Sequence, residues 1–133
     1  AAAAAEAVED LAREAERLRA LQRRIVERLQ GFGARANTVE ADHAPHIVNA
    51  TFPGLRAGDL LFLLDQRDVY ASVGSACRAG VHQPSEVLLA MGRSDDEAAA
   101  SLRFSMGWST TDEDVDRLLA ALDECVESAR LAF

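Results

Sequence analysis

The thiol of Cys77 is the side chain of this sequence whose surroundings best suit chemistry. Residues 73–80 are mostly glycine, serine and alanine, and Arg78 directly follows the cysteine. A core cysteine has bulky apolar neighbours, whereas an accessible thiol beside a cation favours the thiolate, which is the nucleophile. On this local pattern alone, a reactive thiol and an inert loop cysteine are equally open.

The other cysteine and the histidines carry no comparable signal. Cys125 lies close to the apolar stripe of the last predicted helix, where a thiol packs as a small hydrophobe. Two cysteines without CxxC or Cys/His spacing predict neither a disulfide framework nor a metal site. No role is predicted for His43 and His46, and the one role left open for His82 is that of a proton relay.

The composition indicates one globular domain. The 133 residues are 49% hydrophobic and 27% charged, which suits a soluble chain with a single core. A formal net charge of −8 argues against nucleic-acid binding, which needs a concentrated positive field. No apolar run approaches the length of a membrane span, and the alanine-rich start lacks the features of a signal peptide, so we expect a cytoplasmic location.

The elements that must position Cys77 begin with a long amphipathic helix over residues 1–31, which ends at the glycines around Phe32. One side of this helix carries the apolar residues Val8, Leu11, Ala15, Leu18, Ile25 and Leu29. Two β-like stretches follow at residues 35–40 and 47–52, and we expect them to pair as antiparallel neighbours. The pattern of residues 57–66 predicts a short helix. Because the run at 60–64 is continuously apolar, we expect this helix to be buried on most sides.

The second half of the chain is predicted to return to the same sheet. A short strand at residues 69–72 leads into the cysteine segment, which we expect to be a mobile surface loop within residues 72–83. Pro84 opens a helix that ends before Gly92, and the capping-box pattern at residues 94–97 opens another. A strand at 101–106 and a long helix after residue 110 complete the chain. The mixture predicts an α/β fold, with a small, mostly antiparallel sheet covered by the long terminal helices.

Several motifs, taken in order, resemble those of the NifS/IscS-type cysteine desulfurases in the class V aminotransferase family. The sequence SVGSAC at residues 72–77 is followed by PSEVL at 84–88 and AMG at 90–92. Upstream, NATFPG at 49–54 is similar to the family's Asn-x-Ser-Phe-Pro-Gly strand end. Downstream, SLRFSMG at 101–107 is similar to its Arg-Phe-Ser-x-Gly strand. The resemblance implies a single C-terminal small domain of a fold-type I pyridoxal-phosphate enzyme over residues 1–133, with 1–31 as the linking helix.

The resemblance also implies an activity and two site residues. The family moves sulfur from L-cysteine to an enzyme cysteine, as a persulfide, and releases L-alanine. Cys77 corresponds to the cysteine that attacks the sulfur, and Arg103 to the arginine that binds the substrate's α-carboxylate through two parallel hydrogen bonds. Without the motif, an ion pair of Arg103 with a nearby acid would be the simpler expectation. The family is homodimeric and delivers its sulfur to an acceptor protein, such as an iron–sulfur scaffold.

The cofactor of the family places a limit on what this chain can do alone. Pyridoxal 5'-phosphate is held there by a Schiff base to a lysine of the large domain. All 14 basic residues of this chain are arginine, so we expect the large cofactor-binding domain to lie outside these residues and this part alone to be inactive. Arg78 and Trp108 depart from the family pattern, which leaves partner recognition open. The alternatives are a stand-alone sulfur-carrier or scaffold-binding module without pyridoxal-phosphate chemistry, and a helical interaction domain in which Cys77 is incidental.

Overall fold

The order of helices and strands follows the prediction. The structure is a computed structural model and describes residues 2–37, 43–74 and 84–132. Its elements are α1 (Ala2–Gly31), β1 (Arg35–Ala36), β2 (Ile47–Thr51), α2 (Ala57–Asp65), β3 (Ser72–Val73), α3 (Glu86–Ala90), α4 (Asp95–Ala99), β4 (Ser101–Ser105) and α5 (Asp112–Ala132).

The strands form one antiparallel sheet in the order β1-β2-β4-β3. β2 and β4 pair along their whole length, from Ile47 opposite Ser105 to Thr51 opposite Ser101. β1 pairs with the outer edge of β2, as predicted, and β3 pairs with the outer edge of β4. The predicted fold class, a small antiparallel sheet covered by helices, is confirmed.

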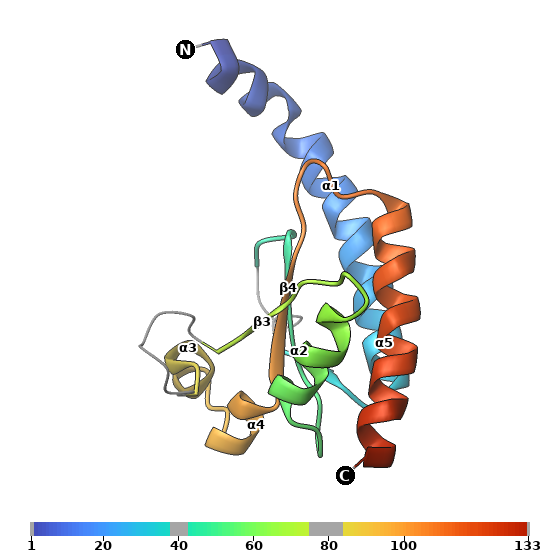
Figure 1. Cartoon of the computed structure of the whole chain (residues 1–133). Helices are drawn as coiled ribbons and strands as arrows, with labels where there is room; N and C mark the ends of the chain where they lie inside the picture. The colour runs from blue at the N-terminus through green and yellow to red at the C-terminus, as the bar shows by residue number, and fades with distance from the viewer. Residues whose placement is uncertain (1, 38–42, 75–83, 133) are drawn as a thin grey trace.

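One face of the sheet packs against α1, α2 and α5, which lie on the same side of it in Figure 1. Because side chains alternate along a strand, β2 and β4 turn Val48, Ala50, Leu102 and Phe104 toward these helices. The helices supply the rest of the core, which includes Leu21, Ile25, Leu29, Leu60, Leu64, Val115, Leu122, Cys125 and Val126. Burial of each large aliphatic side chain contributes about 1.5–3 kcal/mol, so most of the stability comes from this face.

Ion pairs join α1 to α5 outside the core. Arg24 of α1 pairs with Asp112, at 2.7 Å, and with Asp116, both near the start of α5. Arg28 pairs with Asp123 further along the same helix. Pairs this exposed contribute only about 0–1 kcal/mol each, so their main effect is to set the register of two helices that lie side by side (Figure 1).

The surface of α2 corrects one prediction. The side chain of Phe62 is 63% exposed, and only Ala57, Leu60 and Leu64 of this helix are buried. The prediction that the run at residues 60–64 is buried on most sides therefore fails at Phe62, whereas Leu61 and Leu63 are partly buried and pack against the core. The helix meets the core along one side, and its repeat of about 3.6 residues turns the opposite side to solvent however apolar the run is.

The ends of some elements also differ from the prediction. Val8 and Leu11 are 72% and 65% exposed, although the apolar pattern placed them on the buried side. The first turns of α1 project beyond the sheet and α5 in Figure 1, so nothing in the described part of the chain covers them. β3 lies at Ser72–Val73 rather than at 69–72, and β1 spans Arg35–Ala36, while part of the predicted strand 35–40 falls outside the described residues.

Candidate functional site

The sheet face turned away from the core carries a row of polar side chains. Asn49 of β2 lies opposite Arg103 of β4, and Ser72 of β3 lies opposite Arg103 on its other side. Asn37, one residue beyond β1, continues the row, because its N–H donates to the carbonyl of Asn49 at 2.8 Å. Opposite residues of an antiparallel sheet have Cβ atoms about 4.5–5.5 Å apart, so these side chains are neighbours. We call Asn37, Asn49, Arg103 and Ser72 the polar row.

Arg103, the predicted carboxylate-binding residue, lies in the interior of the polar row and is exposed. Among residues 2–37, 43–74 and 84–132, its guanidinium has no ion pair and no side-chain hydrogen bond. The simpler expectation, a pair with a nearby acid, is therefore not met in the described part of the chain. A guanidinium with its donors open is a receptor for a planar anion such as a carboxylate.

A hydrogen-bonded network beside Arg103 fixes the other polar side chains of this face. Asn37 Nδ2 donates to Asn49 Oδ1 at 2.7 Å and to Thr51 Oγ1 at 3.0 Å. The hydroxyl oxygens of Thr51 and Ser101 are 2.8 Å apart, and Ser101 Oγ donates to the carbonyl of Glu97 at 2.7 Å. Thr51 and Ser101 are 1% and 2% exposed, so the network is part of the fold and gives the open face a rigid support. Sequence reasoning missed it, although the alternate polar residues of NATFPG carried a signal.

The N-terminal end of β4 is anchored by the predicted capping box. The Ser94 hydroxyl accepts from the Glu97 N–H at 3.2 Å, and the Glu97 carboxylate accepts from the Ser94 N–H at 2.9 Å. Glu97 also pairs with Arg35, the first residue of β1. The pKa of Glu97 is lowered, mainly by the Ser94 N–H and then by Arg35. This carboxylate therefore ties α4 to β1 immediately before β4 begins.

The C-terminal end of β4 is held from α1. Arg17 donates to the carbonyl oxygens of Gly107 at 3.0 Å and Thr110 at 2.5 Å, in the turn between β4 and α5. Glu14 orients this guanidinium through a contact of 2.7 Å, and the hydrogen bond from Arg17 lowers the pKa of Glu14. Both ends of the strand that carries Arg103 are thus fixed, one by the nearby Glu97 together with Arg35 and the other by Arg17.

The residues of the cysteine segment that have predicted roles follow β3 in the sequence. Cys77, Arg78 and His82 lie outside the described residues, so the predicted sulfur-accepting role of Cys77 stays a prediction. The last described residue before this gap is Gly74, which directly follows Ser72 and Val73 of β3 and has a φ of 58°. A left-handed φ of this kind suits glycine and turns the chain out of the sheet at this point.

Cys125 packs in the core, as predicted, and His43 contacts α1. Cys125 is fully buried in α5, and burial raises the pKa of its thiol, so it is a poor nucleophile. His43 Nε2 lies 3.1 Å from the side-chain oxygen of Gln22, which ties it to α1.

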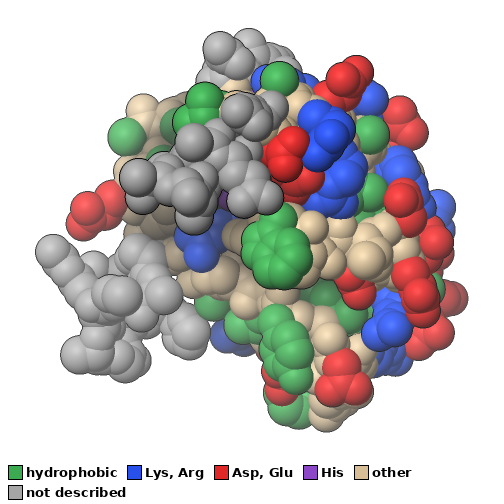
Figure 2. Space-filling model, turned by 90° about the horizontal axis from the view of Figure 1, so that it is seen from above, with side chains coloured by type: hydrophobic (Ala, Val, Ile, Leu, Met, Phe, Trp, Pro, Cys, Tyr) green, Lys and Arg blue, Asp and Glu red, His purple; other side chains and the backbone are tan. Residues whose placement is uncertain are grey.

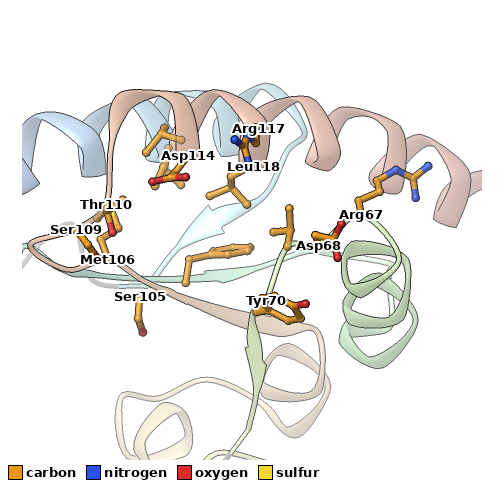
Figure 3. A pocket seen from close by; sticks show the side chains of 14 residues that line it. Arg67, Asp68, Tyr70, Ser105, Met106, Ser109, Thr110, Asp114, Arg117 and Leu118 are labelled. Atoms are coloured by element: carbon orange, nitrogen blue, oxygen red, sulfur yellow. The ribbon is translucent and has the colours of Figure 1, made fainter.

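A separate cavity of about 450 Å³ lies between α5 and the segment before β3 (Figure 3). Tyr70, Met106, Thr110 and Leu118 are among its lining residues, and no member of the polar row is. Tyr70 is 76% exposed at this cavity. In Figure 2, hydrophobic side chains gather near the middle of the view, beside a region where acidic and arginine side chains alternate. The cavity has no combination of groups that suggests a reaction.

The described residues hold neither a cluster of side chains suited to a metal ion nor a helix suited to a membrane span. No cluster of three or more side chains suited to a metal ion occurs within the described ranges. The described helices also include none with the length and apolar character of a membrane span.

Comparisons with known proteins connect this geometry to a family. The family model for aminotransferase class-V matches residues 1–118. An IscS-like cysteine desulfurase of Mycobacterium tuberculosis is 43% identical, over 99% of this chain and 34% of its own length. The cysteine desulfurase IscS of Ectopseudomonas mendocina is 37% identical, over 93% of this chain and 30% of its own length. Among solved structures, a NifS-like protein superposes with a TM-score of 0.77 and 29% identity, over 92% of this chain and 30% of its own.

A more distant structure shows the same fold. Ureidoglycine-glyoxylate aminotransferase of Bacillus subtilis superposes with a TM-score of 0.62 at 17% identity, which speaks for the fold alone. The chain spans about a third of the length of the curated relatives that it matches. Since the family model matches most of the sequence, this chain belongs to the aminotransferase class-V family, whose enzymes use pyridoxal phosphate.

Proposed function

We propose that this chain is the C-terminal small domain of a cysteine desulfurase, which moves sulfur from L-cysteine to Cys77 and releases L-alanine. The observation that carries the proposal is Arg103, an exposed guanidinium with no acidic partner among the described residues, on the open face of the sheet. The relatives named cysteine desulfurase support it. In this role Arg103 binds the substrate's α-carboxylate and so fixes the direction in which its sulfur points.

Cys77 supplies the nucleophile in this proposal. Its thiolate forms a sulfur–sulfur bond with the substrate, while the substrate's carbon–sulfur bond breaks and its electron pair stays with carbon. Protonation of that carbon gives alanine, and Cys77 keeps the transferred sulfur as a persulfide. Ser72, which is opposite Arg103, precedes Cys77 by five residues. A chain of five residues spans at most about 18 Å, so the sequence permits the thiol to reach the carboxylate site.

The residues of this chain do not by themselves fit pyridoxal phosphate. The cofactor supplies an electron sink when bound and needs a lysine for its covalent attachment, whereas all 14 basic residues here are arginine. Its binding residues must therefore come from another part of the protein. We accordingly propose that this chain alone does not form alanine from cysteine.

The partners of the complete protein follow from the same proposal. A persulfide needs a thiol acceptor, so we propose a sulfur-acceptor protein, such as an iron–sulfur scaffold, and a homodimeric enzyme. A cytoplasmic location stays a prediction. The alternative of a stand-alone sulfur carrier gains no support from the relatives that we found, which are named as desulfurases.

The test is alanine formation by the full-length gene product with L-cysteine, pyridoxal phosphate and a reducing thiol. Cys77→Ala should abolish sulfur release and alanine formation, because Cys77 is the proposed nucleophile and the thiol within the described residues, that of Cys125, is fully buried. Cys125→Ala is the matched control and should keep the wild-type rate, since Cys125 is fully buried. A Cys77→Ala protein that turns over at the wild-type rate would contradict the assignment. A wild-type full-length protein without cysteine-dependent alanine formation would contradict the enzyme itself.

A further inference from the structure

The side-chain amide of Asn49 has a fixed orientation beside Arg103. Asn49 Oδ1 accepts from Asn37 Nδ2 at 2.7 Å, and Asn37 is only 7% exposed and is also bonded to Thr51 at 3.0 Å. Asn37 lies on the β1 side of β2, whereas β4 lies on the other side. Oxygen and nitrogen occupy opposite edges of a planar amide. The nitrogen of Asn49 therefore points toward β4, where Arg103 is the residue directly opposite.

This amide nitrogen has no acceptor in the described part of the chain. Asn49 has no side-chain hydrogen bond there beyond the one from Asn37. The nitrogen is also not sealed inside the protein, because the buried side-chain atoms found without a partner in the described residues are Asp59 Oδ2 and Arg93 Nε. Asn49 thus presents two N–H donors at a half-buried position, with nothing in the described chain to receive them.

The charges around the pair favour an anion. Arg103 is the charged member of the polar row, and the nearby network of Asn37, Thr51 and Ser101 is neutral. Arg35, one strand away, is already paired with Glu97. A carboxylate has two oxygens, each able to accept more than one hydrogen bond, so it can take both donors of a guanidinium fork and a further amide N–H.

We propose that Asn49 is a substrate-binding residue whose side-chain N–H donates to the α-carboxylate of the amino-acid substrate, next to Arg103. This inference rests on the proposed function and adds a second residue to the same carboxylate site. Asn37 is a positioning residue in this arrangement, because it turns the Asn49 amide so that nitrogen rather than oxygen meets the anion. An amide in the opposite orientation would place an acceptor beside the carboxylate and repel it.

The test compares two ligands that differ only in the carboxylate. L-alanine and ethylamine share an amine and a two-carbon skeleton, and ethylamine lacks the carboxylate. Binding of each to the full-length protein with its cofactor is measured by calorimetry for the wild type, Asn49→Ala and Asn49→Asp. Asn49→Asp keeps the size of the side chain and can still accept from Asn37, so it tests the amide donor even if the alanine variant fails to fold. Ser105→Ala, two residues from Arg103 on the same face of β4, is the control.

The expected result is a selective loss of L-alanine affinity. Asn49→Ala should weaken L-alanine binding about tenfold, the effect of one hydrogen bond to a charged group, and should change ethylamine binding less than about twofold. Asn49→Asp should weaken it more, about 100-fold, because its carboxylate pairs with Arg103 and competes with the ligand. The same variants should raise the KM for L-cysteine with a smaller change in kcat, and Ser105→Ala should change neither.

Equal losses for L-alanine and ethylamine would overturn the inference, because a merely structural role of Asn49 would affect both ligands. A wild-type protein that does not prefer L-alanine to ethylamine would overturn it as well. The failure of the proposed function has a different signature, which is the absence of alanine formation from L-cysteine in the wild type. An active enzyme whose Asn49→Asp variant keeps the wild-type KM would refute the role of Asn49 and leave the proposed function intact.

Discussion

Replacement of Arg103 by glutamine should separate substrate binding from folding. The guanidinium is exposed and has no ion pair with any residue that the structure describes, whereas its neighbours Leu102 and Phe104 are buried. Glutamine keeps a long polar side chain at this position and leaves the backbone of β4 unchanged. The free energy of unfolding should therefore change by no more than about 0.5 kcal/mol, as for other surface substitutions without partners.

The effect of Arg103→Gln on the substrate should be much larger. A bidentate guanidinium–carboxylate pair is charge-assisted, and a hydrogen bond to a charged group contributes about 1.5–3 kcal/mol. Since Arg103 is open on the sheet face, we take this range for the whole pair and not for each of its two bonds. At about 1.4 kcal/mol for each factor of ten, the KM for L-cysteine should rise about 10- to 150-fold. The KM of Arg103→Lys should lie between those of the wild type and Arg103→Gln, because an ammonium keeps the charge and loses the two parallel hydrogen bonds of the guanidinium.

The assay is alanine formation by the full-length protein over a range of L-cysteine concentrations, with urea unfolding of the same variants. The absorbance of bound pyridoxal phosphate should not change, because Arg103 is not expected to hold the cofactor. Arg103→Gln with a wild-type KM would refute the argument from the open guanidinium. So would a loss of unfolding free energy above about 1.5 kcal/mol, which would show that Arg103 has a structural partner.

Three further predictions concern the fold that supports the site. Leu122→Ala should lower the free energy of unfolding in urea by about 2–5 kcal/mol, because Leu122 is fully buried, and a cost below about 1 kcal/mol would contradict the core described here. Cys125 should resist a thiol reagent at pH 8 until the protein is unfolded, because burial raises its pKa; rapid labelling of the native protein would contradict this. The pKa of Glu97 is lowered from 4.5, so its contribution to stability is present at neutral pH and is lost as the pH falls from 4.5 through the lower folded value. Glu97→Gln should reduce the fall of the urea midpoint across this range, and an unchanged pH profile would contradict the role of the carboxylate.

The parts of the fold that depend on neighbours in the sequence could be predicted from it. The capping box at Ser94 and Glu97 needs a hydroxyl and a carboxylate three residues apart, and both side chains bond as expected. The alternation in SLRFS places Leu102 and Phe104 in the core and Arg103 outside, as a strand requires. The apolar stripe of α5 buries Cys125 in the same way.

The parts that depend on distant residues could not be predicted. The hydrogen bonds from Asn37 to Asn49 and Thr51 need the register of β1 on β2, which no local pattern determines. The contact of Arg17 with the carbonyl of Thr110 joins residues 93 positions apart. The exposure of Phe62 also depends on distant residues. The apolar run around Phe62 predicts burial, whereas the packing of α2 against the rest of the fold decides which side of the helix faces solvent.

The register of β4 connects the stability of the fold to the proposed chemistry. A slip of one residue along this strand would turn Arg103 into the core and expose Leu102 and Phe104 on the polar face. Glu97 fixes the strand at one end and Arg17 at the other, although neither belongs to the polar row. Both side chains therefore act on the carboxylate site only through the position of β4. Their loss should change binding through a shifted or frayed strand, and it should do so together with stability, unlike the loss of Arg103 itself.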